Sequence, residues 1–428
     1  MKRLFNSLFL LSALALTTVV FTGCKDEPDK YEVSGGTPTI RYIRPVGIDG
    51  ADSLLVGAYM DNNICIVGEN LRSIVKMLFN DQEAKLVPSL ITDNTMIVTV
   101  PGQIPGEVFN KIFMINNSND TTTYDFKVLV PGPTINNMNN EWAKPGEKAI
   151  IYGNYFVNDP NIPLTLTING TNIPIDDFSI SQISFTVPGG LTEGPIEIST
   201  VYGKVKAKFN YHDTRGILFN DWGNYDAGEK STGLTNHGWH AQQILSDEHS
   251  LDGSYLMLGD CDLEDGTWAD AKASFEYWPG DWDGTFVGVN SRLSDLVSFA
   301  DFENMALKFE VSIPSSNPWT NLSMQVIFSG DEQVTLPTAN NKFFNGTDYP
   351  RALWTPWRAT GSYDTNDEWV TVTLPITTFK YKNDGTPAGT PLTAKNFTGL
   401  TLFIWSGVTS GTTCHPIIRI DNVRAVAY

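Results

Sequence analysis

The chain has 428 residues, of which 41% are hydrophobic and 18% charged, so the composition is that of a folded protein rather than a disordered one. Its formal net charge of −19 argues against binding to nucleic acid or to anionic polysaccharides, whereas a neutral ligand is compatible. Short alternating runs of polar and apolar residues, separated by 36 glycines and 24 prolines, predict an all-β protein.

The first 23 residues have the features of a signal peptide. Lys2 and Arg3 precede an apolar run that is too short to span a membrane and that ends before Cys24. The small residues in front of Cys24 resemble the bacterial lipobox. That resemblance implies cleavage before Cys24 and acylation of this cysteine, so that lipid alone anchors the mature protein to a membrane.

The segment that follows predicts an address and a tether. Lys25-Asp26-Glu27 resembles the surface-export signal of lipoproteins in the Bacteroidetes, which implies display on the extracellular face of the cell outer membrane. Residues 24–37 are polar and end in Ser34-Gly35-Gly36, a composition typical of a flexible tether.

Two consecutive blocks of sequence share three motifs and are predicted to be internal repeats. Their short strands and turns predict an immunoglobulin-like sandwich over 38–131 and another over 132–213. We expect Gly68 and Gly153 to provide a turn with positive φ. The shared motifs are Pro38-Thr39-Ile40 and Pro133-Thr134-Ile135, Ile66-Val67-Gly68 and Ile151-Tyr152-Gly153, and Val98-Thr99-Val100-Pro101-Gly102 and Phe185-Thr186-Val187-Pro188-Gly189.

These repeats resemble the IPT/TIG family, whose members usually act as spacers or interaction modules. Only Trp142 of the eleven tryptophans lies in this half of the chain. A spacer role is therefore favoured over a second binding site.

Residues 214–428 have a different composition and hold the other ten tryptophans. Strands with one apolar face are predicted at 307–313, 322–328 and 370–374, and strands with two apolar faces at 400–405 and 417–423. This pattern predicts a two-sheet jelly-roll β-sandwich of about 200 residues.

Trp278 and Trp282 are the first candidates for ligand contact. Trp278 lies on the polar side of the strand that begins at Phe275, and Trp282 follows the Pro279-Gly280 turn between two aspartates. Large aromatic rings left in water favour a stacking partner, and the C–H groups of a pyranose ring are a suitable one. Tyr277 shares the face of Phe275, so it is a weaker candidate.

A second group of candidates surrounds Pro356. Trp354 and Trp357 flank this proline in a stretch without strand alternation, and the proline would restrict the orientation of the rings. Arg358, Tyr363 and Asp364 follow, and their polar groups could contact sugar hydroxyls. Among the other tryptophans, Trp319 is a weaker candidate, Trp405 is expected in the core, Trp369 could have either role, and Trp222, Trp239 and Trp268 cannot be placed.

The arrangement as a whole resembles the surface glycan-binding lipoproteins of Bacteroidetes polysaccharide-utilisation loci. The features that carry the resemblance are the lipobox, the IPT/TIG-like repeats and the closing strand Ile420-Asp421-Asn422-Val423-Arg424. It implies a non-catalytic C-terminal domain that binds a neutral plant polysaccharide, a β-glucan or a hemicellulose such as xyloglucan. It also implies delivery to an outer-membrane importer complex and surface hydrolases, and an aromatic pair at Tyr277-Trp278.

Two alternatives stay open: a surface glycoside hydrolase with spacer domains, and an adhesin whose repeats bind proteins. Hydrolysis needs two carboxylates across a cleft, which a sequence cannot measure, and no Gly-x-Ser-x-Gly motif occurs.

No cofactor or metal site is predicted with named ligands. His237 and His240 lack an evident helix and third ligand, and the stretch from Asp260 to Gly266 lacks the glutamate of an EF-hand loop. A structural calcium ion remains possible in the last domain. Cys65, Cys261 and Cys414 are expected to be free thiols, with a bridge between the last two as the alternative.

Overall fold

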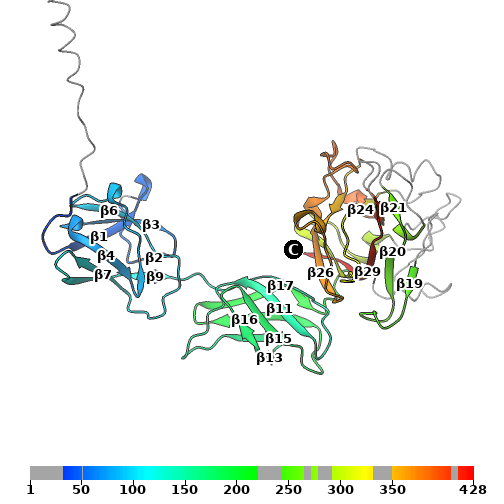
Figure 1. The fold of residues 1–428 in the computed structure, drawn as a ribbon, viewed down its shortest axis with the longest axis horizontal. Helices are drawn as coiled ribbons and strands as arrows, with labels where there is room; N and C mark the ends of the chain where they lie inside the picture. The colour runs from blue at the N-terminus through cyan, green and yellow to red at the C-terminus, as the bar shows by residue number, and fades with distance from the viewer. Residues whose placement is uncertain are drawn as a thin grey trace, which may run out of the picture. The chain divides into compact units, whose positions relative to one another are not determined.

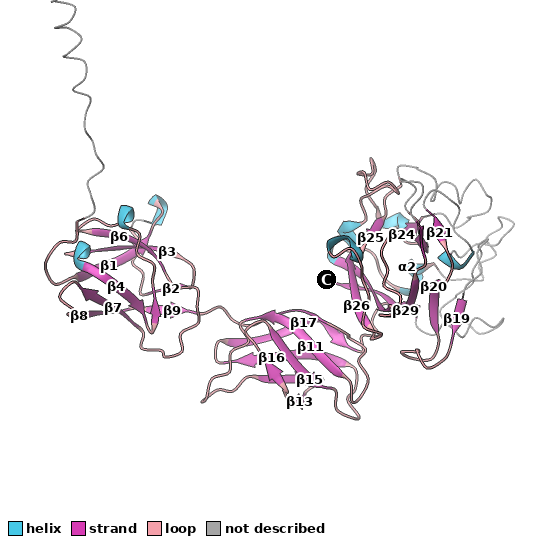
Figure 2. Cartoon of the chain, in the orientation of Figure 1, coloured by secondary structure: helices cyan, strands magenta, loops and turns pink. Residues whose placement is uncertain are grey.

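The computed structural model describes residues 32–50, 52–219, 243–264, 271–277, 292–330, 349–405 and 413–428. This part of the chain is almost entirely β-structure, as predicted (Figure 2). A first compact unit ends at Pro131 and a second begins at Gly132. Cys24 and the predicted signal peptide lie outside the described residues.

Helical structure in the described residues is confined to short turns, and none of these helices is long and apolar enough to cross a membrane. These segments are the α-helix α2 (Leu293–Leu296) and the 3-10 turns η1 (Ile48–Gly50), η2 (Leu71–Ser73), η3 (Pro88–Leu90), η5 (Ala271–Ala273), η6 (Phe302–Asn304), η7 (Pro356–Ala359), η8 (Ile376–Thr378) and η9 (Ala394–Asn396).

The first unit is an immunoglobulin-like sandwich. Its sheets enclose a core that includes Ile64, Ile66 and Phe126. One sheet has the order β1 (Thr39–Pro45), β3 (Asn63–Glu69), β6 (Thr95–Thr99), and the other has the order β5 (Gln82–Glu83), β4 (Ile74–Phe79), β7 (Lys111–Asn116), β8 (Thr121–Asp125). A parallel pair, β2 (Gly57–Tyr59) and β9 (Lys127–Leu129), completes it.

The second unit begins with a sandwich of the same strand arrangement, so the sequence repeat is a structural repeat. Ile151, Leu166 and Phe185 lie in its core. One sheet has the order β10 (Thr134–Met138), β11 (Lys148–Asn154), β15 (Gln182–Thr186), β14 (Asp177–Phe178), and the other has the order β13 (Thr171–Ile173), β12 (Thr165–Ile168), β16 (Gly194–Thr200), β17 (Gly203–Tyr211).

The glycine shared by the two repeats has a different role from the predicted one. Neither Gly68 nor Gly153 has a positive φ; instead Asn70 (φ 55°) and Tyr155 (φ 60°), two residues later, adopt the left-handed conformation. A Cβ atom on Gly153 would lie 1.9 Å from the carbonyl oxygen of Thr134. The prediction of a positive-φ turn at the glycines is therefore wrong, and the glycine is needed because two backbones approach closely beside a bulge.

We expect Gly153→Ala to destabilise the second unit by about 1–3 kcal/mol, because the strand pair must separate to admit the methyl group. The added Cβ would also lie 2.4 Å from the ring of Phe156. Urea unfolding of the intact chain measures the change. Gly189→Ala is the matched control, since no atom lies within 4 Å of its Cβ position; equal stability of the two variants would contradict the prediction.

The C-terminal domain is a larger sandwich of two main sheets. In Figure 1, β29 lies between β20 and the region of β26, as the strand order requires. One sheet has the order β19 (Gln243–Leu245), β20 (Tyr255–Gly259), β29 (Ile417–Ala427), β23 (Met305–Ser312), β26 (Val370–Pro375), with β18 (Ile217–Phe219) also paired to β29, and the other has the order β22 (Ser274–Tyr277), β27 (Gly399–Ile404), β24 (Met324–Ser329), β25 (Ala352–Trp354). A short pair joins β21 (Leu263–Glu264) to β28 (Thr413–Cys414).

Four buried charges connect the C-terminal domain to the preceding immunoglobulin-like domain. Glu141 follows β10, Lys308 and Glu310 lie on β23, and Arg424 lies on β29; none of these side chains is more than 4% exposed. Lys308 and Arg424 both donate to Glu141, and Arg424 also donates to Glu310 at 2.8 Å. We call these four residues the joint network. The immunoglobulin-like domain supplies Glu141, and the C-terminal domain supplies the two cations that neutralise it, Lys308 and Arg424. The network therefore fixes how the two domains meet.

Aromatic rings pack around the joint network. Trp142 is 5% exposed and stacks on His212 at 4.7 Å, and the Arg424 guanidinium lies 6.0 Å from the Trp142 ring. Lys308 Nζ lies 4.5 Å from the ring of Phe209. Trp142 is therefore a packing residue at the joint.

The stability of the joint is expected to fall as the pH falls below about 6.5, the ordinary pKa of histidine. Burial lowers the pKa of His212, although nearby Asp252 and Glu193 act in the opposite direction. A lowered pKa in the folded state means that the neutral ring stabilises the fold above the unfolded pKa and that this contribution is lost on acidification. We expect His212→Phe, which keeps a stacking ring, to show a weaker decrease in melting temperature between pH 7 and pH 5. An equal decrease in both proteins would contradict this.

Candidate functional site

Trp278 and Trp282 lie outside the described residues, whereas their neighbour Tyr277 lies within them. Tyr277 ends β22 with 1% of its surface exposed, and its ring lies 5.4 Å from that of Phe219. Burial raises the pKa of its hydroxyl. Tyr277 therefore belongs to the core and offers no face to a ligand, because its side chain points between the sheets with Phe275.

Trp354 is half-buried at the end of β25. Its ring lies 5.4 Å from that of Trp319, 5.8 Å from that of Phe309 and 6.1 Å from that of Tyr363. Trp319 is 1% exposed, which places this weaker candidate in the core. Trp354 thus lies at the margin of the core, with part of its surface accessible.

Trp357 and Tyr363 lie near Trp354, and hydrogen bonds fix their positions. Pro356 begins the turn η7, within which Trp357 donates from Nε1 to the carbonyl of Leu322 at 2.9 Å. The backbones of Tyr363 and Trp319 exchange two hydrogen bonds. Both Trp357 and Tyr363 are half-buried, whereas Arg358 is exposed. Trp357 and Tyr363 are therefore held in place before a ligand binds, and the Arg358 guanidinium is accessible to a hydroxylated ligand.

Tyr277 and Trp354, one residue from each predicted group, do not lie at one place on the sheet. Tyr277 pairs with Leu400, which pairs with Phe328 at one end of β24, whereas Trp354 pairs with Met324 at the other end. Since β22 and β25 are also the two edge strands, Tyr277 and Trp354 lie at diagonal corners, roughly 20 Å apart from the usual strand spacing and rise. Tyr277 and the group around Trp354 therefore occupy different corners of this sheet.

The acidic stretch considered for calcium has a different partner. Asp262 and Asp260 lie 2.9 Å and 3.4 Å from the two ring nitrogens of His415, and hydrogen bonds that these carboxylates accept from the ring raise the pKa of the histidine. Across the described residues, no group of three or more His, Cys, Asp or Glu side chains is placed to hold a metal ion. His237 and His240 lie outside this part of the chain. Cys65, Cys261 and Cys414 are not joined in disulfides.

Sequence reasoning did not assign Trp369, which lies in a cleft at the joint with the second immunoglobulin-like domain. Nor did it find Glu141, whose partners on β23 and β29 are more than 160 residues away in the chain. The only sequence signal was the charged residues within apolar strands, Lys308 and Glu310 in β23 and Arg424 in β29.

Comparisons with known proteins agree with this architecture. The family model for the surface glycan-binding protein B xyloglucan binding domain matches residues 211–427, just over half of the 428-residue chain. The crystal structure of a surface glycan-binding protein from Prevotella bryantii is 38% identical, covers 92% of this chain and 99% of that chain, and superposes with a TM-score of 0.77. An IPT/TIG domain-containing protein of Bacteroides ovatus is 29% identical over 211 residues, which are 45% of this chain. The match spans only 42% of that relative's length.

Proposed function

The chain belongs to the family of surface glycan-binding proteins of the B type, and from that premise we propose that its C-terminal domain binds a neutral plant polysaccharide of the xyloglucan or β-glucan kind, without catalysis. The observation that carries the proposal is the match of residues 211–427 to a xyloglucan binding domain. The net charge of −19 fits this ligand class, because an acidic surface repels anionic polysaccharides but not neutral ones.

We assign the binding to two groups of aromatic residues. Trp278 and Trp282 follow β22 in the sequence, and Trp354, Trp357 and Tyr363 gather at the end of β25, with Arg358 as a hydrogen-bond donor. Rings held by packing and hydrogen bonds lose little freedom when a sugar stacks on them. By analogy with base stacking, each ring contributes about 1–3 kcal/mol, so three rings near the top of that range reach the roughly 8 kcal/mol of micromolar affinity.

The protein is proposed to capture this polysaccharide at the cell surface for import. Acylated Cys24 would hold it on the extracellular face of the outer membrane, and the bound chain would pass to an importer complex and to surface hydrolases. The joint network supports this role, because it keeps the glycan-binding domain at a set orientation to the spacer domain next to it.

Affinity electrophoresis of the intact chain tests the proposal. Gels containing xyloglucan or mixed-linkage β-glucan are expected to retard the protein, whereas gels containing pectin, an anionic control, are not. The proposal fails if none of the neutral glycans retards it. Measuring the release of reducing sugar from the same glycans separates binding from hydrolysis, and release at an enzymatic rate would favour the hydrolase alternative.

A further inference from the structure

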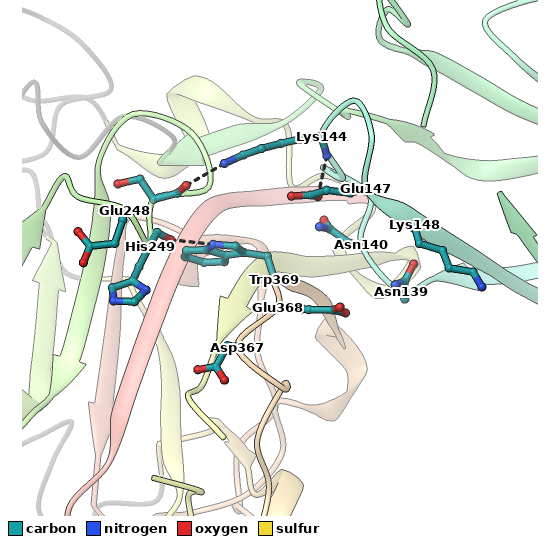
Figure 3. A pocket seen from close by; sticks show the side chains of 11 residues that line it. Asn139, Asn140, Lys144, Glu147, Lys148, Glu248, His249, Asp367, Glu368 and Trp369 are labelled. Atoms are coloured by element: carbon teal, nitrogen blue, oxygen red, sulfur yellow. Dashed lines mark hydrogen bonds between the residues drawn. The ribbon is translucent and has the colours of Figure 1, made fainter. Parts of the chain in front are cut away.

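A cleft of about 330 Å³ lies where the second immunoglobulin-like domain meets the C-terminal domain (Figure 3). Three segments line it: residues from 139 to 148 of the second immunoglobulin-like domain, residues 248–250 between β19 and β20, and residues 367–369 just before β26. Because the joint network holds the same two domains together, the walls of the cleft are fixed relative to each other.

Trp369 is the aromatic residue in this cleft, and its half-buried ring is held in place. Its Nε1 donates to the carbonyl of His249 at 3.0 Å, and Tyr255 packs edge-on at 6.0 Å. The turn before it contains Asn366 (φ 53°) and Asp367 (φ 64°), two successive non-glycine residues in the left-handed region. Asn and Asp adopt this conformation more readily than other non-glycine residues, and the turn leads directly into Trp369.

Two amides supply unused donors on the facing wall. Asn139 accepts a hydrogen bond from the backbone N–H of Ile150 at 2.7 Å, and Asn140 accepts one from Trp142 at 2.9 Å. These bonds orient each amide with its oxygen occupied. Within the described part of the chain, neither Nδ2 group donates a hydrogen bond, which leaves both available to a ligand.

The charges around the cleft select against an anion. Lys144 and Lys148 face four carboxylates, those of Glu147, Glu248, Asp367 and Glu368. Lys144 Nζ is also already bonded to the carbonyl of Ser250 at 2.9 Å. An indole ring, free amide donors and surplus carboxylate acceptors match the C–H faces and hydroxyl groups of a neutral sugar.

We propose that this cleft is a second carbohydrate subsite, which holds one or two rings of the polysaccharide against Trp369. The inference rests on the proposed function. The subsite differs from both corners of the β22–β25 sheet, because Trp369 precedes β26 in the opposite sheet. It would make the joint part of the binding surface and let a long glycan contact the spacer domain.

Fluorine NMR of the intact chain labelled with fluorotryptophan tests the subsite. Trp369→Phe identifies the resonance of Trp369 by its loss. Titration with a xylogluco-oligosaccharide is expected to shift this resonance in a saturable way, and Trp357→Ala is expected to leave that shift in place. Glu368→Lys at the exposed rim is expected to weaken the oligosaccharide affinity read from the Trp369 resonance at least about ten-fold. This variant tests the subsite while the Trp369 ring stays in place.

The outcomes separate the two proposals. If other tryptophan resonances shift while that of Trp369 stays unchanged at saturating oligosaccharide, the subsite is overturned and the proposed function stands. If no resonance shifts with xylogluco-oligosaccharide or with mixed-linkage oligosaccharide, both are overturned. If the shift of the Trp369 resonance disappears in Trp357→Ala, the shift is an indirect effect of glycan binding near Trp357. This outcome would also overturn the subsite.

Discussion

Replacing Arg424 by methionine is expected to lower the free energy of unfolding of the second unit by about 3–5 kcal/mol, because it leaves the buried carboxylate of Glu310 without a countercharge. Burial alone would lower the pKa of Arg424, but the carboxylates of Glu310 and Glu141 raise it above its ordinary value. The interaction is therefore strong enough to keep the guanidinium charged in the interior. Urea unfolding followed by tryptophan fluorescence measures the loss.

Lys272→Met is the matched control for this charge removal. Lys272 lies 3.9 Å from Asp260 in an ion pair whose side chains are 41% and 47% exposed, so about 0–1 kcal/mol is expected. Adding Glu310→Gln to Arg424→Met should recover part of the loss, since this buried acid is then removed together with its arginine while Glu141 keeps its ion pair with Lys308. Equal effects of Arg424→Met and Lys272→Met would contradict a structural role for the joint network.

The pH dependence of the Arg424→Met variant follows from Glu310. Burial already raises the pKa of Glu310, and Arg424 opposes this rise. Without the arginine, the pKa rises further, so the folded state favours the protonated acid. A carboxyl group whose pKa is higher in the folded state than in the unfolded state stabilises the fold below its unfolded pKa. This contribution to stability is lost as the pH rises toward the folded pKa. The defect of the variant should therefore be larger at pH 8 than at pH 5.

Replacing both Trp278 and Trp282 by alanine is expected to weaken binding to xyloglucan at least about 30-fold with little change in melting temperature. Each stacking ring is worth about 1–3 kcal/mol, or roughly 5- to 150-fold in affinity, so the combined loss is about 2–6 kcal/mol. Isothermal titration calorimetry and a thermal melt of the same sample measure the two quantities. Binding retained within a factor of two would contradict the assignment of this corner.

Trp354→Ala provides the contrast at the other corner. Its ring contacts Phe309 and Trp319 inside the sandwich, so its removal is expected to lower stability by about 2–4 kcal/mol as well as to weaken binding. Trp319→Ala should lower stability at least as much, because Trp319 is 1% exposed. A Trp354→Ala variant with unchanged stability would show that this ring contributes chiefly to ligand contact.

The pattern of residues along the chain was sufficient for the all-β class, the two repeats and the larger sandwich. These properties depend on local alternation and turn chemistry, which are written in consecutive residues. The same information placed Tyr277 on the face of Phe275, and its burial follows from that alternation. The repeated glycine was found in the sequence, but the reason that glycine is required there was not. A Cβ atom at this position would collide with the carbonyl of Thr39 or Thr134 on the neighbouring strand.

Pairing between distant segments was decided only in the tertiary structure. Strand register separates Tyr277 from Trp354 on the sheet, although both lie in stretches with the same local signature of aromatic residues beside proline. Glu141 meets Arg424 across 283 residues, and the cleft around Trp369 needs walls from two domains. Charge neutralisation and enclosure of a ligand depend on which side chains come within a few ångströms of each other. Local residue patterns do not contain those distances.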